Sequence, residues 1–233
     1  MQKLLDNRKL VVTVLVVGII LATAMALGPL IYSLMVGGGV KTEGVDASRT
    51  KAASVELDGQ WKVIQGSAQN YSSVGFTFDE VLPGERTTTS GSTTNVTGQA
   101  TIAGEVLEQA SVEVDMTQLT TDKVVRDRNM KSKLFHTEQY PTATFSLTQP
   151  TNLSQVPDDG TAGTVPIKGE LTIKGQTQPV EADFQVIRDG KHIVISSDIA
   201  INRLDFGVET PEMIAATIAE EGQVNVRLTF AQD

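Results

Sequence analysis

Residues 163–202 read GTVPIKGELTIKGQTQPVEADFQVIRDGKHIVISSDIAIN. From Ile167 to Ile173, apolar side chains alternate with polar ones, which is the period of a strand with one buried and one solvated face. Lys174-Gly175 interrupts this pattern, and Asp189-Gly190 lies between two further β-type runs, so both dipeptides are typical of tight turns. The stretch therefore predicts three consecutive antiparallel strands.

The same alternation continues on both sides of this stretch. It predicts eight or nine strands, near residues 55–64, 71–81, 92–103, 105–117, 142–149, 163–173, 177–188, 191–202 and 222–230. Two segments, 121–136 and 211–220, have a helix-forming composition instead. Strands with one apolar face can close into a barrel or pack as a two-sheet sandwich, and periodicity does not choose between them. The difference matters, because an eight-stranded barrel can hold one small ligand, whereas a sandwich core is filled.

The N-terminal segment has a different composition. No charged residue occurs from Leu10 to Val40, and the apolar part of this run ends at Val36. A helix needs roughly 20 apolar residues to cross about 30 Å of hydrocarbon, so residues 10–36 predict a transmembrane helix. Three basic residues and one acidic residue precede the run, which favours a cytoplasmic N-terminus and an exported remainder.

A cleaved signal peptide is the competing interpretation of this run. The small-residue patterns at Ala22–Ala24 and Ala24–Ala26 would permit cleavage, but the apolar run continues past Ala26. With a retained anchor, we expect a single-pass protein of the cell membrane with its C-terminal domain outside the cytoplasm. Its parts are then a cytoplasmic segment, a transmembrane helix, a flexible linker and a β-domain, at residues 1–9, 10–36, 37–54 and 55–233.

Composition excludes several classes of function. The chain contains no cysteine, which rules out disulfides, thiol nucleophiles and cysteine-bound metals. Two histidines leave little room for a metal site or for histidine-based catalysis, so we expect no metal, no cofactor and no enzymatic activity. The net charge of −9 repels phosphate backbones, which argues against a nucleic-acid partner.

Four ordered motifs carry a resemblance to a known family. They are Trp61-Lys-Val-Ile64 with Gly66-Ser67, Arg126-Asp127 followed by Leu134-Phe135 and Tyr140-Pro-Thr-Ala-Thr-Phe145, the hairpin from Gly169 to Val180, and Asn202-Arg-Leu-Asp-Phe-Gly207. In this order they resemble the YceI-like family of polyisoprenoid-binding proteins. The sequence departs from that family's pattern in its first strands, where the usual histidines are missing, and at Asn129-Met130, where His-Leu is usual. No ligand contact made by those histidines is carried over to this chain.

The resemblance implies an all-β fold, an antiparallel lipocalin-like barrel of about eight strands with one or two short helices. It also implies an apolar tunnel that takes an isoprenoid or another long-chain lipid, with no catalytic residues. The candidate lining residues are Trp61, Phe76, Phe78, Val112, Val114, Met116, Phe145, Leu171, Ile173 and Phe184.

Each of these residues also has a purely structural interpretation. The ten apolar residues can simply fill a core, in which case the domain acts in protein–protein interaction at the cell envelope. Arg126 can contact a phosphate head group, or it can form an ion pair that ties a helix to the barrel. We expect Arg203 and Asp205 to form a structural pair. An enzyme acting on a lipid is the third hypothesis, and the sequence shows no nucleophile–base or metal set for it.

Overall fold

The computed structural model describes residues 12–13, 16–19, 22–23, 40–82, 85–210 and 217–232. The chain divides into two compact units, Met1–Gly37 and Gly38–Asp233. Within the described residues, no helix has both the length and the apolar character needed to cross a membrane. The predicted transmembrane helix at 10–36 lies largely outside the described residues, as does the predicted segment 1–9.

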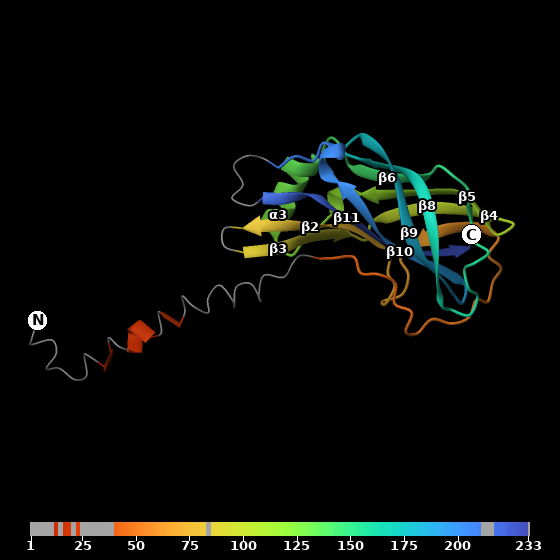
Figure 1. Cartoon of the computed structure of the whole chain (residues 1–233), viewed down its shortest axis with the longest axis horizontal. Coiled ribbons are helices and arrows are strands. Elements are labelled where there is room, and N and C mark those ends of the chain that lie inside the picture. The colour runs from red at the N-terminus through yellow and green to blue at the C-terminus, as the bar shows by residue number, and fades with distance from the viewer. Residues whose placement is uncertain are drawn as a thin grey trace, which may run out of the picture. The chain divides into compact units, whose positions relative to one another are not determined.

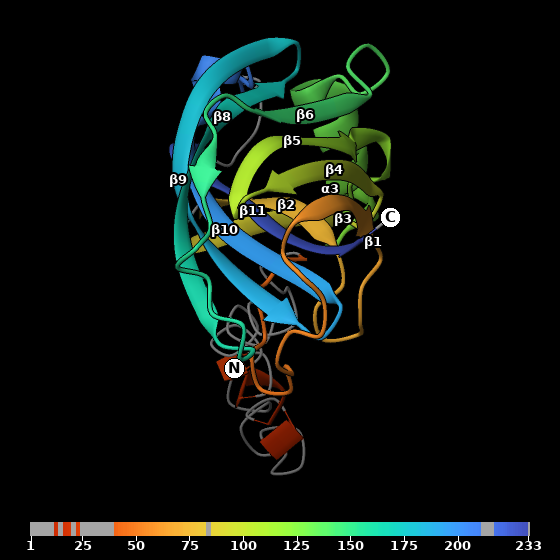
Figure 2. The same ribbon diagram turned by 90° about the vertical axis from the view of Figure 1, so that its right-hand side faces the viewer.

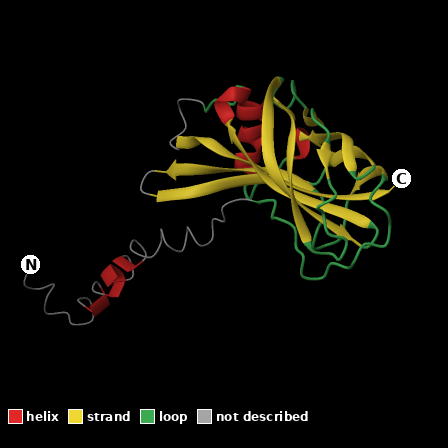
Figure 3. Cartoon of the chain, turned by 45° about the vertical axis from the view of Figure 1, so that its right-hand side comes forward, coloured by secondary structure: helices red, strands yellow, loops and turns green. Residues whose placement is uncertain are grey.

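The second unit is built from antiparallel strands and a few short helices (Figures 1 and 3). The strands are β1 Gly59–Ile64, β2 Ser73–Leu82, β3 Glu85–Thr93, β4 Val96–Ala103, β5 Val106–Asp115, β6 Thr142–Leu147, β7 Thr151–Asn152, β8 Ala162–Ile173, β9 Gln176–Asp189, β10 His192–Asn202 and β11 Thr217–Gln232. The helical elements are η1 Met116–Gln118, α3 Val124–Asn129, the π-helix η2 Met130–Phe135, and η3 Arg203–Phe206.

Eight of the strands close into a barrel (Figure 2). The pairing order β1-β4-β5-β6-β8-β9-β10-β11 returns to its start because β1 also pairs with β11. The predicted all-β antiparallel barrel with few short helices is therefore confirmed, and the two-sheet sandwich is excluded. The tight turns predicted at 174–175 and 189–190 connect β8 to β9 and β9 to β10.

The long strand β11 pairs with two different strands, β1 and β2, along one of its edges. Its last residues, Thr229–Gln232, pair with β1, whereas the preceding part, Thr217–Arg227, pairs with β2. Strand β2 pairs in turn with β3, and Ser92 of β3 forms a bridge to Thr120, which precedes α3. Backbone pairing is thus continuous where β1 closes the barrel, whereas β3 contacts the segment before α3 through an isolated bridge.

Two sequence predictions need correction here. The helix predicted over 211–220 is wrong for residues 217–220, which begin β11: Thr217 and Ile218 pair with β2, and sheet pairing overrides helix propensity. Residues 211–216 lie outside the described residues. The single strand predicted over 92–103 is two strands, β3 and β4, and β3 takes up the Thr-rich stretch before it. The helix predicted over 121–136 appears as α3 followed by η2.

Residues 40–54, called the strap here, lie against the barrel (Figure 1). The hydroxyl groups of Thr42 and Ser73 are 2.7 Å apart. Asn70 accepts from the backbone N–H of Asp46 at 2.8 Å and donates to its carbonyl oxygen at 2.9 Å. Further bonds join the strap to the β9–β10 turn. The polar composition that predicts a flexible linker instead supplies hydrogen bonds that hold this part of it on the barrel.

Candidate functional site

An elongated apolar cavity runs through the barrel. It leaves about 160 Å³ to the centres of water-sized molecules. An engineered apolar cavity of similar size, ~150 Å³, stays dry and binds small apolar molecules. Apart from Gly75, Thr144 and Arg203, every lining residue is apolar. The interior of this barrel is therefore suited to hydrocarbon and not to water.

The strand period builds this wall directly. On β10 the residues at every second position from Ile193 line the cavity as far as Ile201, with the single exception of Ser197. At about 3.4 Å per residue, the distance from Ile193 to Ile201 is about 27 Å. Strand β11 contributes Val224 through Phe230 with the same alternation. The cavity lining thus follows most of the length of β10 and the second half of β11.

Two glycines make room for aromatic rings on the inner wall. A Cβ atom at Gly169 of β8 would overlap the ring of Phe145, and a Cβ atom at Gly222 of β11 would overlap the ring of Phe78. Neither glycine has a positive φ, so the requirement is steric. These contacts hold both rings against the wall and keep the centre of the barrel open.

The two ends of the barrel differ in construction. We call the end with the β4–β5 and β9–β10 turns the turn end, and the end with η1, α3, η2 and η3 the helical end. At the turn end Trp61 is 2% exposed, and its indole N–H donates to the carbonyl oxygen of Leu57 at 3.0 Å. Both residues line the cavity. The turn end is therefore closed by a large aromatic side chain with a fixed orientation.

Charged groups meet the interior only at the helical end, within the described residues. Arg203 lines the cavity, is 8% exposed, and donates to three carbonyl oxygens, those of Val208, Ile218 and Ala219, at 2.6, 3.2 and 3.0 Å. The expected pairing of Arg203 with Asp205 is wrong, because these carbonyl groups take the guanidinium instead. In the sequence, only the motif from Arg203 to Gly207 marks this arginine, and nothing there predicts its carbonyl partners.

Glu80 is the second charged group at this end. It follows Phe76 and Phe78 at the strand period of β2, is 9% exposed, and its Oε2 atom has no hydrogen-bond partner among the described residues. A buried polar atom without a partner is uncommon and costs stability. The helical end thus offers a carboxylate and an arginine beside an otherwise apolar interior.

A carboxylate at each end has its pKa held below its ordinary value. At the helical end, the hydroxyl and N–H groups of Thr117 donate to Asp115 and lower its pKa, with burial opposing them. At the turn end, the N–H groups of Glu105 and Gly104 donate to Asp58 and lower its pKa. Both carboxylates shape backbone turns and lie outside the cavity wall.

All ten candidate lining residues of the sequence line this one cavity, and their contact with a ligand stays a prediction. They are Trp61, Phe76, Phe78, Val112, Val114, Met116, Phe145, Leu171, Ile173 and Phe184. Sequence patterns missed further lining residues such as Leu57 and Phe206, which lie outside the strands.

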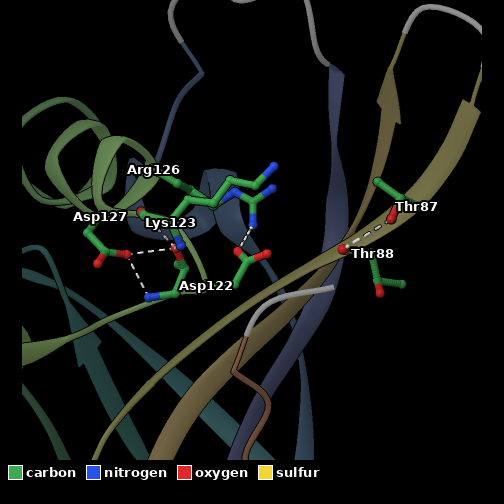
Figure 4. A network of polar contacts seen from close by, with 7 residues as sticks. Thr87, Thr88, Asp122, Lys123, Arg126 and Asp127 are labelled. Atoms are coloured by element: carbon green, nitrogen blue, oxygen red, sulfur yellow. Dashed lines mark hydrogen bonds and ion pairs between the residues drawn. The ribbon is translucent and has the colours of Figure 1, made fainter. Parts of the chain in front are cut away.

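Arg126 is not among the lining residues. Its guanidinium pairs with Asp122, one turn earlier (Figure 4). The neighbouring Asp127 accepts from the N–H and hydroxyl groups of Thr121, both at 2.6 Å. These contacts fix the start of α3 from within the segment, and a head-group contact by Arg126 stays a prediction.

The lining of the cavity is suited to binding an apolar ligand. Among the described residues no group of three or more histidine or acidic side chains is placed to hold a metal ion. Among the described residues that line the cavity, Arg203 is the only charged one, and its guanidinium donates to carbonyl groups. What the cavity can do is remove a long apolar chain from water.

Comparison with known proteins gives a consistent family. The family model of the YceI-like domain matches residues 66–230. The protein YceI of Escherichia coli O157:H7 is 29% identical over 110 residues, which cover 44% of this chain and 53% of that protein. The UPF0312 protein plu2095 of Photorhabdus laumondii is 29% identical over 117 residues, covering 50% of this chain and 45% of that one. The chain thus spans about half the length of the curated relatives it matches.

Two solved structures share the fold. Burkholderia cenocepacia BcnA matches with a TM-score of 0.53 and 22% identity, over 68% of this chain and 95% of that one. A polyisoprenoid binding domain from Saccharophagus degradans, implicated in plant cell wall breakdown, matches with a TM-score of 0.53 and 17% identity, over 70% and 98%.

Proposed function

The chain belongs to the YceI-like family, and from that premise we propose that it is a membrane-tethered, extracytoplasmic protein that sequesters an isoprenoid or similar lipid in its barrel. The observation that carries this proposal is the continuous apolar cavity, whose lining residues extend along about 27 Å of β10 at 3.4 Å per residue. The polyisoprenoid binding domain from Saccharophagus degradans has the same fold and supports the choice of ligand class.

The energetics favour a long tail over a specific polar contact. Each buried CH₂ group contributes about 0.8 kcal/mol, so a tail of several isoprene units binds through its length alone. The tail points toward Trp61 at the turn end, because that end is apolar and closed. The head group stays near Arg203 and Glu80 at the helical end, where polar atoms are within reach. Val114 lies between these ends on the cavity wall.

Membrane tethering rests on the N-terminal sequence. The uncharged run at 10–36 supports a single membrane-spanning helix, and the basic residues before it support an extracytoplasmic barrel. The tether keeps the barrel near the bilayer that supplies the lipid and raises the frequency of encounter. In this function the protein carries and does not transform its ligand, so it needs no cofactor.

Val114→Trp in the full chain tests the carrier function. The indole fills the cavity, so we expect loss of a bound radiolabelled polyprenol while the free energy of unfolding changes by less than about 1 kcal/mol. The matched control is Val165→Trp, because Val165 is fully buried yet does not line the cavity. Overpacking there should cost about 1–3 kcal/mol.

A different result would contradict the carrier function. If Val114→Trp destabilises the protein as much as Val165→Trp, and the parent chain retains no polyprenol, the barrel is a filled domain. The protein-interaction function would then replace the carrier function.

A further inference from the structure

Residues 123–133, called the basic ridge here, concentrate positive charge on an acidic protein. The ridge holds five of the 19 basic residues in a chain of net charge −9. Its one acidic residue, Asp127, is bonded to Thr121. Arg128, Lys131 and Lys133 take part in none of the ion pairs among the described residues. The ridge therefore presents uncompensated positive charge.

The same ridge exposes apolar side chains. Val124 is 75% exposed and Val125 is 67% exposed, the two highest values among the large apolar residues that the structure describes in the barrel unit. Val81, at the end of β2, and Leu204, in η3, are 47% and 41% exposed at the helical end as well. Figure 1 shows α3 at the end of the barrel toward which β2 runs. Four of the five large exposed apolar residues described in this unit thus lie at one end; the fifth is Val40 of the strap.

Exposed valines cost free energy in water unless a partner covers them. Apolar side chains combined with lysine and arginine are typical of helices that lie in the interface of an anionic bilayer. The turn end has a different surface, with Asp58, Glu105 and Asp189 beside Lys191 around its two turns. An anionic surface attracts the basic ridge more strongly than it attracts these turns.

We propose that the basic ridge docks on the surface of an anionic phospholipid bilayer, with Val124 and Val125 inserted at the level of the head groups. This inference rests on the proposed function, because docking would bring the helical end, where Arg203 and Glu80 meet the interior, to the source of the lipid. Docking also fixes which end of the barrel faces the membrane, which a tether alone does not.

Single-cysteine labelling of the full chain tests the proposal, since the chain contains no cysteine of its own. Val125→Cys and, at the turn end, Lys191→Cys are each labelled with an environment-sensitive fluorophore. Both proteins are reconstituted into nanodiscs that carry a lipid-bound quencher, made of phosphatidylglycerol with phosphatidylcholine or of phosphatidylcholine alone. We expect quenching at position 125 in the anionic discs, and little at position 191 or in the neutral discs.

Charge removal provides the second variant. Lys131→Gln with Lys133→Gln should lower the ratio of docked to undocked protein by about thirtyfold, at roughly a factor of five per charge. The control, Lys51→Gln with Lys168→Gln, removes the same charge away from the ridge and should leave quenching unchanged. Equal quenching at positions 125 and 191, equal quenching in neutral discs, or no effect of the ridge variant would overturn the proposal. Polyprenol retention measured on the same samples reports separately on the carrier function.

Discussion

The turn end and the helical end of the barrel are closed by different kinds of structure. At the turn end, short hairpins and Trp61, bonded to Leu57, close the wall, and backbone pairing continues to the turns with a single register shift between Thr101 and Ile102 of β4. At the helical end, β11 leaves β1 for β2, its pairing is irregular between Ile218 and Gly222, and helical turns replace strands. Regular pairing opens only with much of the fold, whereas irregular segments open locally at lower cost. For the proposed carrier function, we therefore expect the lipid to enter and leave through the helical end.

The largest expected effect is at the turn end. Trp61→Ala removes a buried indole and should lower the free energy of unfolding by about 3–5 kcal/mol. Chemical denaturation of the full chain measures it. Trp61→Phe is the control, because it keeps most of the volume and loses the bond to Leu57. A cost below about 1 kcal/mol for the alanine variant would show that the turn end is not held by this residue.

Arg203→Met perturbs the opposite end. Three carbonyl groups lose a charged donor, which we expect to cost about 3 kcal/mol. Hydrogen exchange should accelerate more in residues 217–220 than in residues 229–232 of the same strand. Uniform acceleration along β11 would contradict an independently opening helical end.

Gly222→Ala narrows the cavity near the helical end. The new methyl group must displace the ring of Phe78 toward the open interior, at a cost of about 1–3 kcal/mol and with weaker polyprenol retention. Gly44→Ala of the strap is the control, because its Cβ would meet only the Ser196 hydroxyl, at 3.8 Å. If retention is unchanged in Gly222→Ala, the ring of Phe78 does not border the ligand.

The smallest effect concerns acid stability. Because hydrogen bonding lowers the folded pKa of Asp58 below 3.8, its stabilising contribution is complete above that pH and is lost as pH falls through the lower folded pKa. Asp115 follows the same sign. Asp58→Asn and Asp115→Asn should each flatten the fall of Tm below about pH 4. An undiminished fall in both variants would place the acid-sensitive groups elsewhere.

The residues of the inner wall could be predicted from the sequence because the alternation of apolar and polar side chains is a local pattern. Alternation such as Val112–Val114 on β5 predicts which side chains share a face of the sheet. Periodicity does not distinguish a closed barrel from a sandwich, and the resemblance to the YceI-like family predicted the barrel. Features that depend on distant partners were missed. Thr217 and Ile218 are strand because β2 lies beside them, and the strap is held by Asn70 and the β9–β10 turn. Arg203 finds its carbonyl partners only once η3 and β11 meet.

Native mass spectrometry of the full chain, released from its own membranes in detergent micelles, tests the central claim most directly. We expect one adduct per chain that passes into organic solvent on extraction and shows the regular mass series of isoprene units. The same adduct should be missing from Val114→Trp. A parent chain that carries no adduct, and that takes up none after incubation with excess polyprenol, would contradict the lipid-carrier account.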